Sequence, residues 1–598
     1  MKEPFLQKEA SLRARVEELL TLSEKELEKA LLPLKFEELF ELVLATPWEK
    51  RAKLILYSPY PQGIVRNLPP IELFFTLKGS SLDLAVELLS YAKGTQIQFL
   101  FDFDCWYKDR LKAERVASWI ILLFEAGEDK VLEWLSIADW DFLIALMLKF
   151  LRIHKRPDDV DLLEAYDYLP PYTLDDVYFV EFKDERLEFY FRRIIELIRE
   201  TWPETYFAFM ESLLWEIPSD VEERAFRFRN GRLADEGIPD YYTALEVYTY
   251  IHPKKLSKVE YKSLPEGEPE EEEGQTTLYL VPYEGPEDFL VQKALSLIRD
   301  PQVLSRIQRE LAWLTTKVIL VDHPVIDDVE EVRKGIHKMW CGLNLGLEYL
   351  AEGNPEAAKE LLKNHYLEEI FRVSRTALRE LRKFALSLLN NKEFNVALLK
   401  YLDQPYAGYL KGVTVRRLNE VKLFNPLNMG TDKEYVEFSR VSELRMVRRY
   451  LEEIGYMAPL LEKGLGPVSS WVKEMIQPGR NFDLNFLTWS SIILTALTQY
   501  VYSQEFTFKA IPRKAWREVF PRLVEKRGEK TYLKDELKEK LFENFKALAK
   551  GVYYLDQELL SGFLNFVIDR FENEFKFAEP EDPPDPKYQT LILIELSS

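Results

Sequence analysis

The chain has 598 residues and a formal net charge of -21, which makes a nucleic acid an unfavourable partner, because each phosphate contact needs a cation. Hydrophobic residues form 47% of the sequence and aromatic residues 13%, enough for about two to four domains with buried cores. The two cysteines, Cys105 and Cys341, exclude a disulfide framework and favour a reducing compartment, so we expect a cytoplasmic protein.

Residues 1–155 are predicted to form a series of short amphipathic helices. Apolar residues recur at i, i+3 and i+4 in stretches such as "LKFEELFELVLA" and "AERVASWIILLFEAG", and brief loops with Pro or Gly separate them. Ser23 and Glu26 have the spacing of a capping box at the start of one helix. The opening residues contain no apolar leader. This succession of short amphipathic helices and brief loops is typical of an α-solenoid or superhelical helix array.

The fold class that we predict is mainly α, with an additional helical bundle and a few short strands beyond the array. Residues 156–262 are expected to be a helical region with one short strand at "VYFVEF", residues 177–182. The abundance of Glu and Lys and the scarcity of oxidisable residues are typical of proteins from hot habitats.

The stretch "RAFRFRNGRLADEGIPD", residues 224–240, places Arg224, Arg227, Arg229 and Arg232 within nine residues of an acidic chain. We expect a helix to end here, with Gly231 at its C′ position. The four arginines have three interpretations: structural pairing with acids, binding of a partner protein, or binding of a small anion. The acidic residues 266–273 are a candidate intramolecular partner.

The rest of the chain is divided by composition. Residues 263–286 read as an acidic linker followed by a strand, 287–455 as helical hairpins, and 456–598 as a C-terminal helical region with an extended tail. "EGNPEAAKELL" favours a helix hairpin over a peptide-binding groove. The uncharged stretch 484–504 is long enough to span a membrane, but its polar residues favour a buried helix, and we expect no membrane insertion.

No short catalytic motif is present, and no cofactor is expected. Asp322, His323, Asp327 and Asp328 are weak candidates for a divalent-metal site, and His337 and Cys341 share one helical face behind them. The competing interpretation is that Asp327 caps a helix whose dipole Asp328 and Glu330 complement.

The pair Asp102 and Asp104 in "FDFDCW" could act in acid–base chemistry if it lies on a strand. The alternative is that the two carboxylates cap a helix and orient a turn beside a buried Trp106. The second reading fits a helical array better.

Several stretches resemble an uncharacterised bacterial family known only as a domain of unknown function. They include "SPYPQGIVRNLPPIELFFTLKGSSLDLAVELL", "GRLADEGIPDYYTALEVY", "LNLGLEYLAEGNPEAAKELL" and "PDPKYQTLILIE", so the resemblance extends over most of the chain. It implies no activity. Residues 1–150 are also similar in architecture to the superhelical cytoplasmic N-domain of MgtE-type magnesium transporters, whose transmembrane bundle has no counterpart here.

The function that this sequence favours is that of an interaction or scaffold protein, with regulation as one option, whose partner is another protein. Aromatic residues and arginine, which dominate interface hot spots, are both well represented. The alternative is an enzyme or sensor that binds a small anionic metabolite or a divalent metal at residues 224–240 or 322–341. A third option is a membrane-associated partner of a transport system.

Overall fold

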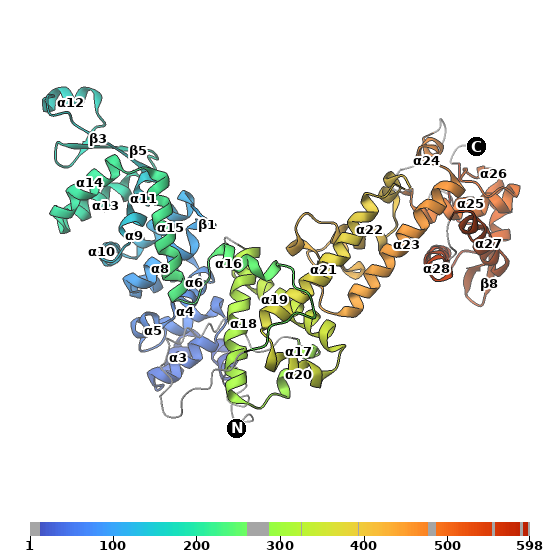
Figure 1. The fold of residues 1–598 in the computed structure, drawn as a ribbon, viewed down its shortest axis with the longest axis horizontal. Coiled ribbons are helices and arrows are strands. Elements are labelled where there is room, and N and C mark those ends of the chain that lie inside the picture. Colours follow the sequence, from blue (N-terminus) through green and yellow to red (C-terminus); the bar gives the residue numbers. More distant parts are fainter. Residues whose placement is uncertain are drawn as a thin grey trace. The chain divides into compact units, whose positions relative to one another are not determined.

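The computed structural model describes residues 12, 14–259, 286–323, 326–392, 394–476, 486–552, 556–585 and 590–595. Helices dominate it, which confirms the mainly α prediction (Figure 1). The chain packs as two compact units, Met1–Arg372 and Val373–Ser598, each with its own core. We refer to them as unit 1 and unit 2. The five-part division of the sequence and the superhelical character of residues 1–155 remain predictions.

Unit 1 contains the larger number of described helices, most of them two to four turns long. In chain order its helices are α2 Glu24–Leu31, α3 Phe36–Ala45, α4 Trp48–Leu56, α5 Pro61–Asn67, α6 Pro70–Lys78, α7 Leu82–Tyr91, α8 Gly94–Asp104, α9 Ala113–Ala126, α10 Glu128–Leu135, α11 Trp140–Phe150, α12 Leu162–Tyr168, α13 Glu188–Thr201, α14 Pro203–Trp215, α15 Pro218–Asp235, α16 Tyr241–Leu245, η1 Glu246–Tyr248, α17 Leu290–Ser296, α18 Pro301–Asp322, α19 Val329–Ala351 and α20 Pro355–Asn364.

Helix α21, Leu367–Leu389, runs across the boundary between the units. The remaining helices belong to unit 2: η2 Val396–Tyr401, α22 Tyr406–Val413, η3 Leu418–Glu420, η4 Pro426–Asn428, α23 Val441–Leu465, α24 Val468–Met475, α25 Trp489–Ser503, α26 Arg513–Leu523, α27 Asp535–Val552 and α28 Gln557–Glu574.

The strands are short and antiparallel, and the described ones form four small sheets. They are β1 Trp106–Tyr107 with β2 Arg110–Leu111, β3 Leu151–Lys155 with β4 Tyr172–Thr173 and β5 Tyr178–Phe182, β6 Leu423–Phe424 with β7 Tyr435–Val436, and β8 Val524–Arg527 with β9 Lys530–Leu533. In the three-stranded sheet β5 is central, and Ile153 of β3 pairs with Val180. Strand β5 confirms the strand predicted at residues 177–182.

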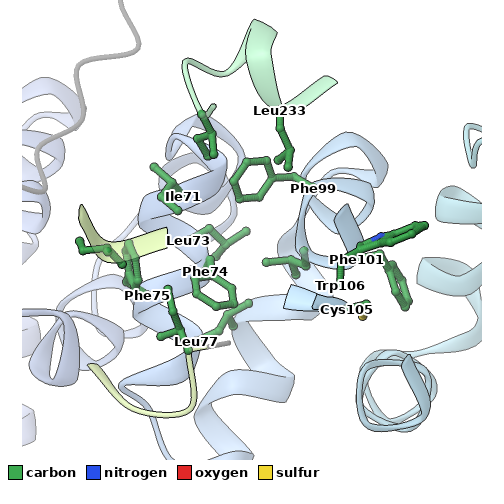
Figure 2. Packing of buried hydrophobic residues seen from close by; sticks show 14 of the residues in the cluster. Ile71, Leu73, Phe74, Phe75, Leu77, Phe99, Phe101, Cys105, Trp106 and Leu233 are labelled. Atoms are coloured by element: carbon green, nitrogen blue, oxygen red, sulfur yellow. The ribbon is translucent and has the colours of Figure 1, made fainter. Parts of the chain in front are cut away.

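The core of unit 1 is built from buried apolar side chains that successive helices contribute. Figure 2 shows Phe74 and Phe75 of α6, Phe99 and Phe101 of α8, and Leu233 of α15 within the same packed cluster. Leu233 belongs to a row of four buried residues on α15, spaced four apart, that begins at Val221. A row with this spacing lies on one side of a helix, so α15 presses that side against α8 and α11.

Two local predictions are confirmed. The Ser23 amide donates to Glu26 Oε2 at 3.1 Å, which completes the capping box of α2. The stretch 484–504 contains α25, whose residues from Trp489 to Gln499 are all buried, so it is a core helix. Among the described residues, no helix has both the length and the apolar character that crossing a membrane requires.

Other local predictions are wrong. Gly231 is not a C′ residue: α15 continues past it to Asp235, because Leu233 still packs in the core, and Gly237 takes the positive φ of 71° after the helix. Asp328, not Asp327, caps α19, its carboxylate accepting from the Glu330 amide at 3.1 Å.

The later part of the chain continues with helices. Residues 355–389 form two of them, α20 and α21, which are separated near His365. In the tail, Ile594 makes one parallel bridge with Ile511, and residues 591–594 are buried as an apolar strap. The acidic linker at 263–277 and the strand expected at 277–284 lie outside the described residues.

Candidate functional site

The structure brings together two stretches that the sequence singled out, "FDFDCW" and the arginine stretch. Asp102 lies within α8, not on a strand, and is buried beneath α15. Arg232 binds this carboxylate in a bidentate manner: Nε donates to Oδ2 at 2.6 Å and Nη2 donates to Oδ1 at 2.9 Å. Gln98 adds a third donor to Oδ1 at 3.0 Å. Burial raises the pKa of Asp102, and the Arg232 guanidinium opposes that rise.

Asp104, two residues on, faces a different set of partners. Its carboxylate lies 2.8 Å from Lys78 Nζ and 3.0 Å from an Arg115 nitrogen, and it accepts a hydrogen bond from the indole of Trp119 at 2.8 Å. Asp102 and Asp104 therefore point into separate ion-pair networks, and neither caps a helix. This separation removes the shared site that acid–base chemistry by the pair would need.

Arg229 is the most enclosed of the four arginines. Its Nε donates to the main-chain oxygen of Asp102 at 2.6 Å, and its guanidinium lies 5.6 Å from the centre of the Trp106 ring. Burial lowers the pKa of Arg229 to about 10. Trp106 is buried, as the sequence predicted. Arg229 and Arg232 together fix α15 to the end of α8.

Arg224 and Arg227 lie nearer the surface. Arg224 donates to Asp141 at 2.9 Å and to Glu216 at 3.1 Å, which ties the start of α11 to the corner between α14 and α15. Arg227 is exposed and pairs with Glu223 one turn earlier. The four side chains thus diverge from one helix and do not converge on one anion. Their proposed contact with residues 266–273 falls outside the described part of the chain.

The weak metal candidates are separated by their own partners. Asp322 accepts from the Tyr248 hydroxyl at 2.9 Å and pairs with Lys338 at 2.6 Å, whereas Asp327 pairs with Arg115. Nδ1 of His323 is 3.9 Å from Glu331, and burial lowers the pKa of this histidine. Within the described residues, no group of three or more His, Cys, Asp or Glu side chains is arranged to hold a metal.

The helix face predicted to carry His337 and Cys341 is present. Nε2 of His337 lies 3.4 Å from Sγ of Cys341 on α19. Cys341 is buried there as a free thiol.

An open pocket of about 260 Å³ occurs in unit 1 beside α18 and the start of α21. Its lining is Glu310, Trp313, Tyr366, Glu368, Glu369 and Arg372. The carboxylates already have partners: Glu368 pairs with Lys317 at 2.8 Å, and Glu369 accepts from the Ser257 hydroxyl at 2.8 Å. Three carboxylates and one guanidinium do not suit an anionic metabolite.

Sequence reasoning missed the large apolar side chains that are exposed on α12 and α14. Leu163 of α12 is 83% exposed, and Trp215 at the end of α14 is 74% exposed. The other large apolar side chains exposed on these elements and the following corner are Tyr166, Tyr168, Phe207 and Ile217. We call Phe207, Trp215 and Ile217 the α14 surface. Helix α14 adjoins β3 in unit 1 (Figure 1). Helix α12 packs against the opposite face of the sheet, where the ring of Tyr166 contacts Phe179.

Helix α14 shows why this surface is apolar on the outside. Its buried residues, among them Phe209 and Leu213, face the core, while Phe207, Glu211 and Trp215 follow one another at intervals of four on the outer side. A helix with apolar residues on both sides has one side without a partner. The stretch "PETYFAFMESLLWEI" already indicated this, because its apolar residues recur at helical spacing on two opposite faces.

Glu211 makes this surface rigid. It pairs with Lys155 of β3 at 2.6 Å, accepts from the hydroxyl of Tyr178 on β5, and accepts from the indole of Trp215 at 2.8 Å. These contacts, led by the Lys155 hydrogen bond, lower the pKa of Glu211 to about 2. One carboxylate thus joins the sheet to α14 and orients the exposed tryptophan.

The segment that contains these helices is strongly acidic. Residues 157–223 contain 19 Asp and Glu against 5 Lys and Arg, a net charge of -14 out of -21 for the whole chain. Residues 157–182 contain eight acids and no Lys or Arg. Among the described residues, none of the seven acids from Asp158 to Asp176 lies within 4.0 Å of a cationic nitrogen.

Fold and exposed residues together define a mainly α protein that presents large apolar side chains on α14 beside a small sheet. The chain belongs to the family of unknown function DUF6178, whose model matches residues 28–595. No curated protein and no solved structure matches the chain. The similarity of residues 1–150 to the N-domain of MgtE-type transporters therefore remains a prediction.

Proposed function

We propose that this protein is an interaction protein that binds another protein through the α14 surface. The observation that carries the proposal is Trp215, 74% exposed and yet held in place by Glu211. Exposed tryptophan and tyrosine side chains with fixed orientation lose little conformational entropy on binding and supply most of the energy of protein interfaces. Large apolar side chains that are exposed together on one helix face are typical of an interaction site.

The arginine stretch supports this role indirectly. Arg224 holds Glu216 next to Trp215, and Arg229 and Arg232 anchor α15 to α8 behind it. In this proposal Arg224, Arg229 and Arg232 stabilise the packing of the helices that carry the surface, and only the exposed Arg227 can contact a partner. Buried free thiols at Cys105 and Cys341 support a reducing compartment such as the cytoplasm.

The test is co-purification of the tagged full chain from its native organism. Phe207→Ser together with Trp215→Ser removes the two most exposed rings of α14. The matched control, Leu427→Ser together with Phe577→Ser, removes two apolar side chains from unit 2 that are at least as exposed. We expect a stoichiometric partner with the wild type and the control, and loss of that partner with the α14 variant at unchanged helicity. Retention by the α14 variant would refute the proposal.

A further inference from the structure

The open pocket beside α18 and the start of α21 is lined by side chains of both charges. Two of its three carboxylates are neutralised by cations of α18 that do not line the pocket. Glu310 pairs with Arg306, one turn earlier in the helix, and Glu368 pairs with the buried Lys317 at 2.8 Å. A charged group that enters the pocket therefore gains little from these two carboxylates.

The other two charged residues of the lining, Glu369 and Arg372, have no opposite charge in ion-pair contact within the described part of the chain. Glu369 accepts from the amide and the hydroxyl of Ser257, at 2.6 and 2.8 Å. Arg372 donates through Nε and Nη2 to the main-chain oxygens of Thr249 and Tyr250, at 3.4 and 3.3 Å. These partners are neutral, so one negative and one positive charge remain uncompensated in the pocket.

These two charges lie on one side of α21. Residues three apart in a helix are neighbours on its surface, with Cβ atoms about 5–6 Å apart. Glu369 and Arg372 nevertheless form no ion pair with each other, because each is hydrogen-bonded to residues 249–257 instead. A small molecule between them can contact both side chains at once, and it compensates both charges if it carries an ammonium and a carboxylate of its own.

Two aromatic rings complete the lining. Trp313 of α18 is 37% exposed, and Tyr366, just before α21, is 41% exposed. Exposed rings beside charged groups are typical of a site that holds the apolar part of a ligand. The cavity volume of about 260 Å³ is near the lower end of the range for ligand pockets, which suits a small metabolite.

We propose that this pocket binds a free α-amino acid with an apolar side chain. The ammonium of the ligand pairs with Glu369, its carboxylate pairs with Arg372, and its side chain packs on Trp313 and Tyr366. A ligand with only an anionic group would meet three carboxylates, and one with only a cationic group would leave Arg372 uncompensated. No residue of the α14 surface lines this pocket, so the inference is independent of the proposed function.

Isothermal titration calorimetry of the full chain with matched probes tests the class of ligand. L-phenylalanine and L-leucine carry both charges and differ in the size of the side chain. L-phenylalaninamide keeps the ammonium but lacks the carboxylate, as the N-terminus of a peptide does, and 3-phenylpropanoate keeps the carboxylate but lacks the ammonium.

We expect L-phenylalanine or L-leucine to bind with a Kd below about 1 mM, the range in which proteins bind metabolites. Each phenylalanine analogue should bind at least about tenfold more weakly than L-phenylalanine, because it loses one charge-assisted contact. If neither amino acid binds, or if an analogue binds as tightly as L-phenylalanine, the inference is wrong. This series uses the unmodified chain and does not depend on the folding of a variant.

Two variants locate the ligand in this pocket. Glu369→Gln keeps an oxygen that can accept from Ser257, and it should abolish the preference for L-phenylalanine over 3-phenylpropanoate. Arg372→Gln should abolish the preference for L-phenylalanine over L-phenylalaninamide. The control, Glu356→Gln with Lys359→Gln, removes an ion pair of the same spacing from α20, outside the pocket, and should stay within about twofold of the wild type. Wild-type selectivity in both pocket variants, at unchanged helicity, would place the ligand elsewhere and overturn the inference.

Discussion

Glu211 shows how one residue can fix the orientation of a side chain on an exposed surface. Its carboxylate has three donors from three elements, one of which is the exposed Trp215. Such charge-assisted hydrogen bonds are stronger than neutral ones and lower the pKa of the acid that accepts them. The residue is therefore a positioning group: it touches no partner in our proposal but decides where Trp215 points.

The pKa of Glu211, about 2, gives a pH dependence with a definite sign. Because the pKa is lower in the folded protein than its ordinary value of 4.5, the stability that Glu211 contributes is complete above about pH 4.5 and is lost as the pH falls towards 2. Glu211→Gln should therefore be less stable than the wild type at pH 6, and this difference should shrink on acidification. Thermal unfolding of both proteins from pH 6 to pH 3 measures it; a constant difference would contradict the prediction.

The second residue-scale prediction concerns Asp102 and Arg232. Removing one member of a buried ion pair leaves an uncompensated charge and costs about 3 kcal/mol, whereas removing both charges costs much less. Arg232→Met should accordingly lower the stability of unit 1 strongly at pH 7, and the double variant Asp102→Asn, Arg232→Met should recover part of it. Denaturation of the two variants and of Asp102→Asn completes a double-mutant cycle. Additive effects would show that the pair is not coupled.

At the scale of elements, helix periodicity predicted most of what the structure contains. The capping box at Ser23, the strand at residues 178–182 and the buried helix at residues 489–503 all follow from local patterns, because their signals lie within one turn or one strand. The errors have a common cause. Gly231 looks like a helix stop, but Leu233, two residues later, packs in the core, and tertiary packing overrides the local preference.

The candidate surface was less predictable for the same reason. The sequence showed that Phe207 and Trp215 share a helix face, but burial of the opposite face had to be known before theirs could be called exposed. Likewise, nothing local links Arg232 to Asp102, which lie 130 residues apart. The arginine cluster was visible in the sequence; its acidic partners on α8 and α11 were supplied by the fold.

At the same scale, replacing either of two helical glycines by alanine is expected to change the stability of unit 1, in opposite directions. A Cβ at Gly346 of α19 would lie 2.0 Å from the main-chain oxygen of Ile370 on α21, whereas a Cβ at Gly231 of α15 would meet no atom within 4 Å. Gly346→Ala should destabilise unit 1 by about 1–3 kcal/mol, because two helix backbones would have to separate. Gly231→Ala should stabilise it by about 0.5–1 kcal/mol through helix propensity. Melting temperatures of the two variants that shift in the same direction would contradict this account.

At the scale of the whole molecule, charged side chains are distributed unevenly along the chain. Residues 157–223 hold two-thirds of the net charge, and they belong to unit 1. Unit 2 has buried charged groups of its own, such as Glu453, which accepts from the Tyr406 hydroxyl at 2.5 Å. Burial raises the pKa of Glu453 and so disfavours its charged form. This buried carboxylate adds polar contacts to the core of unit 2, whereas the exposed carboxylates between β3 and β5 of unit 1 are in contact with water.

The division into two units predicts how the protein unfolds. Each unit has its own buried core, so heating should produce two calorimetric transitions, which a single two-state model will not fit. Phe101→Ala removes a fully buried ring from unit 1, and Trp489→Ala removes one from unit 2. Each should cost about 3–5 kcal/mol and lower one transition by about 5–15 °C while moving the other little. If both variants moved one common transition, the continuous helix α21, which belongs to both units, would be coupling them into a single cooperative structure.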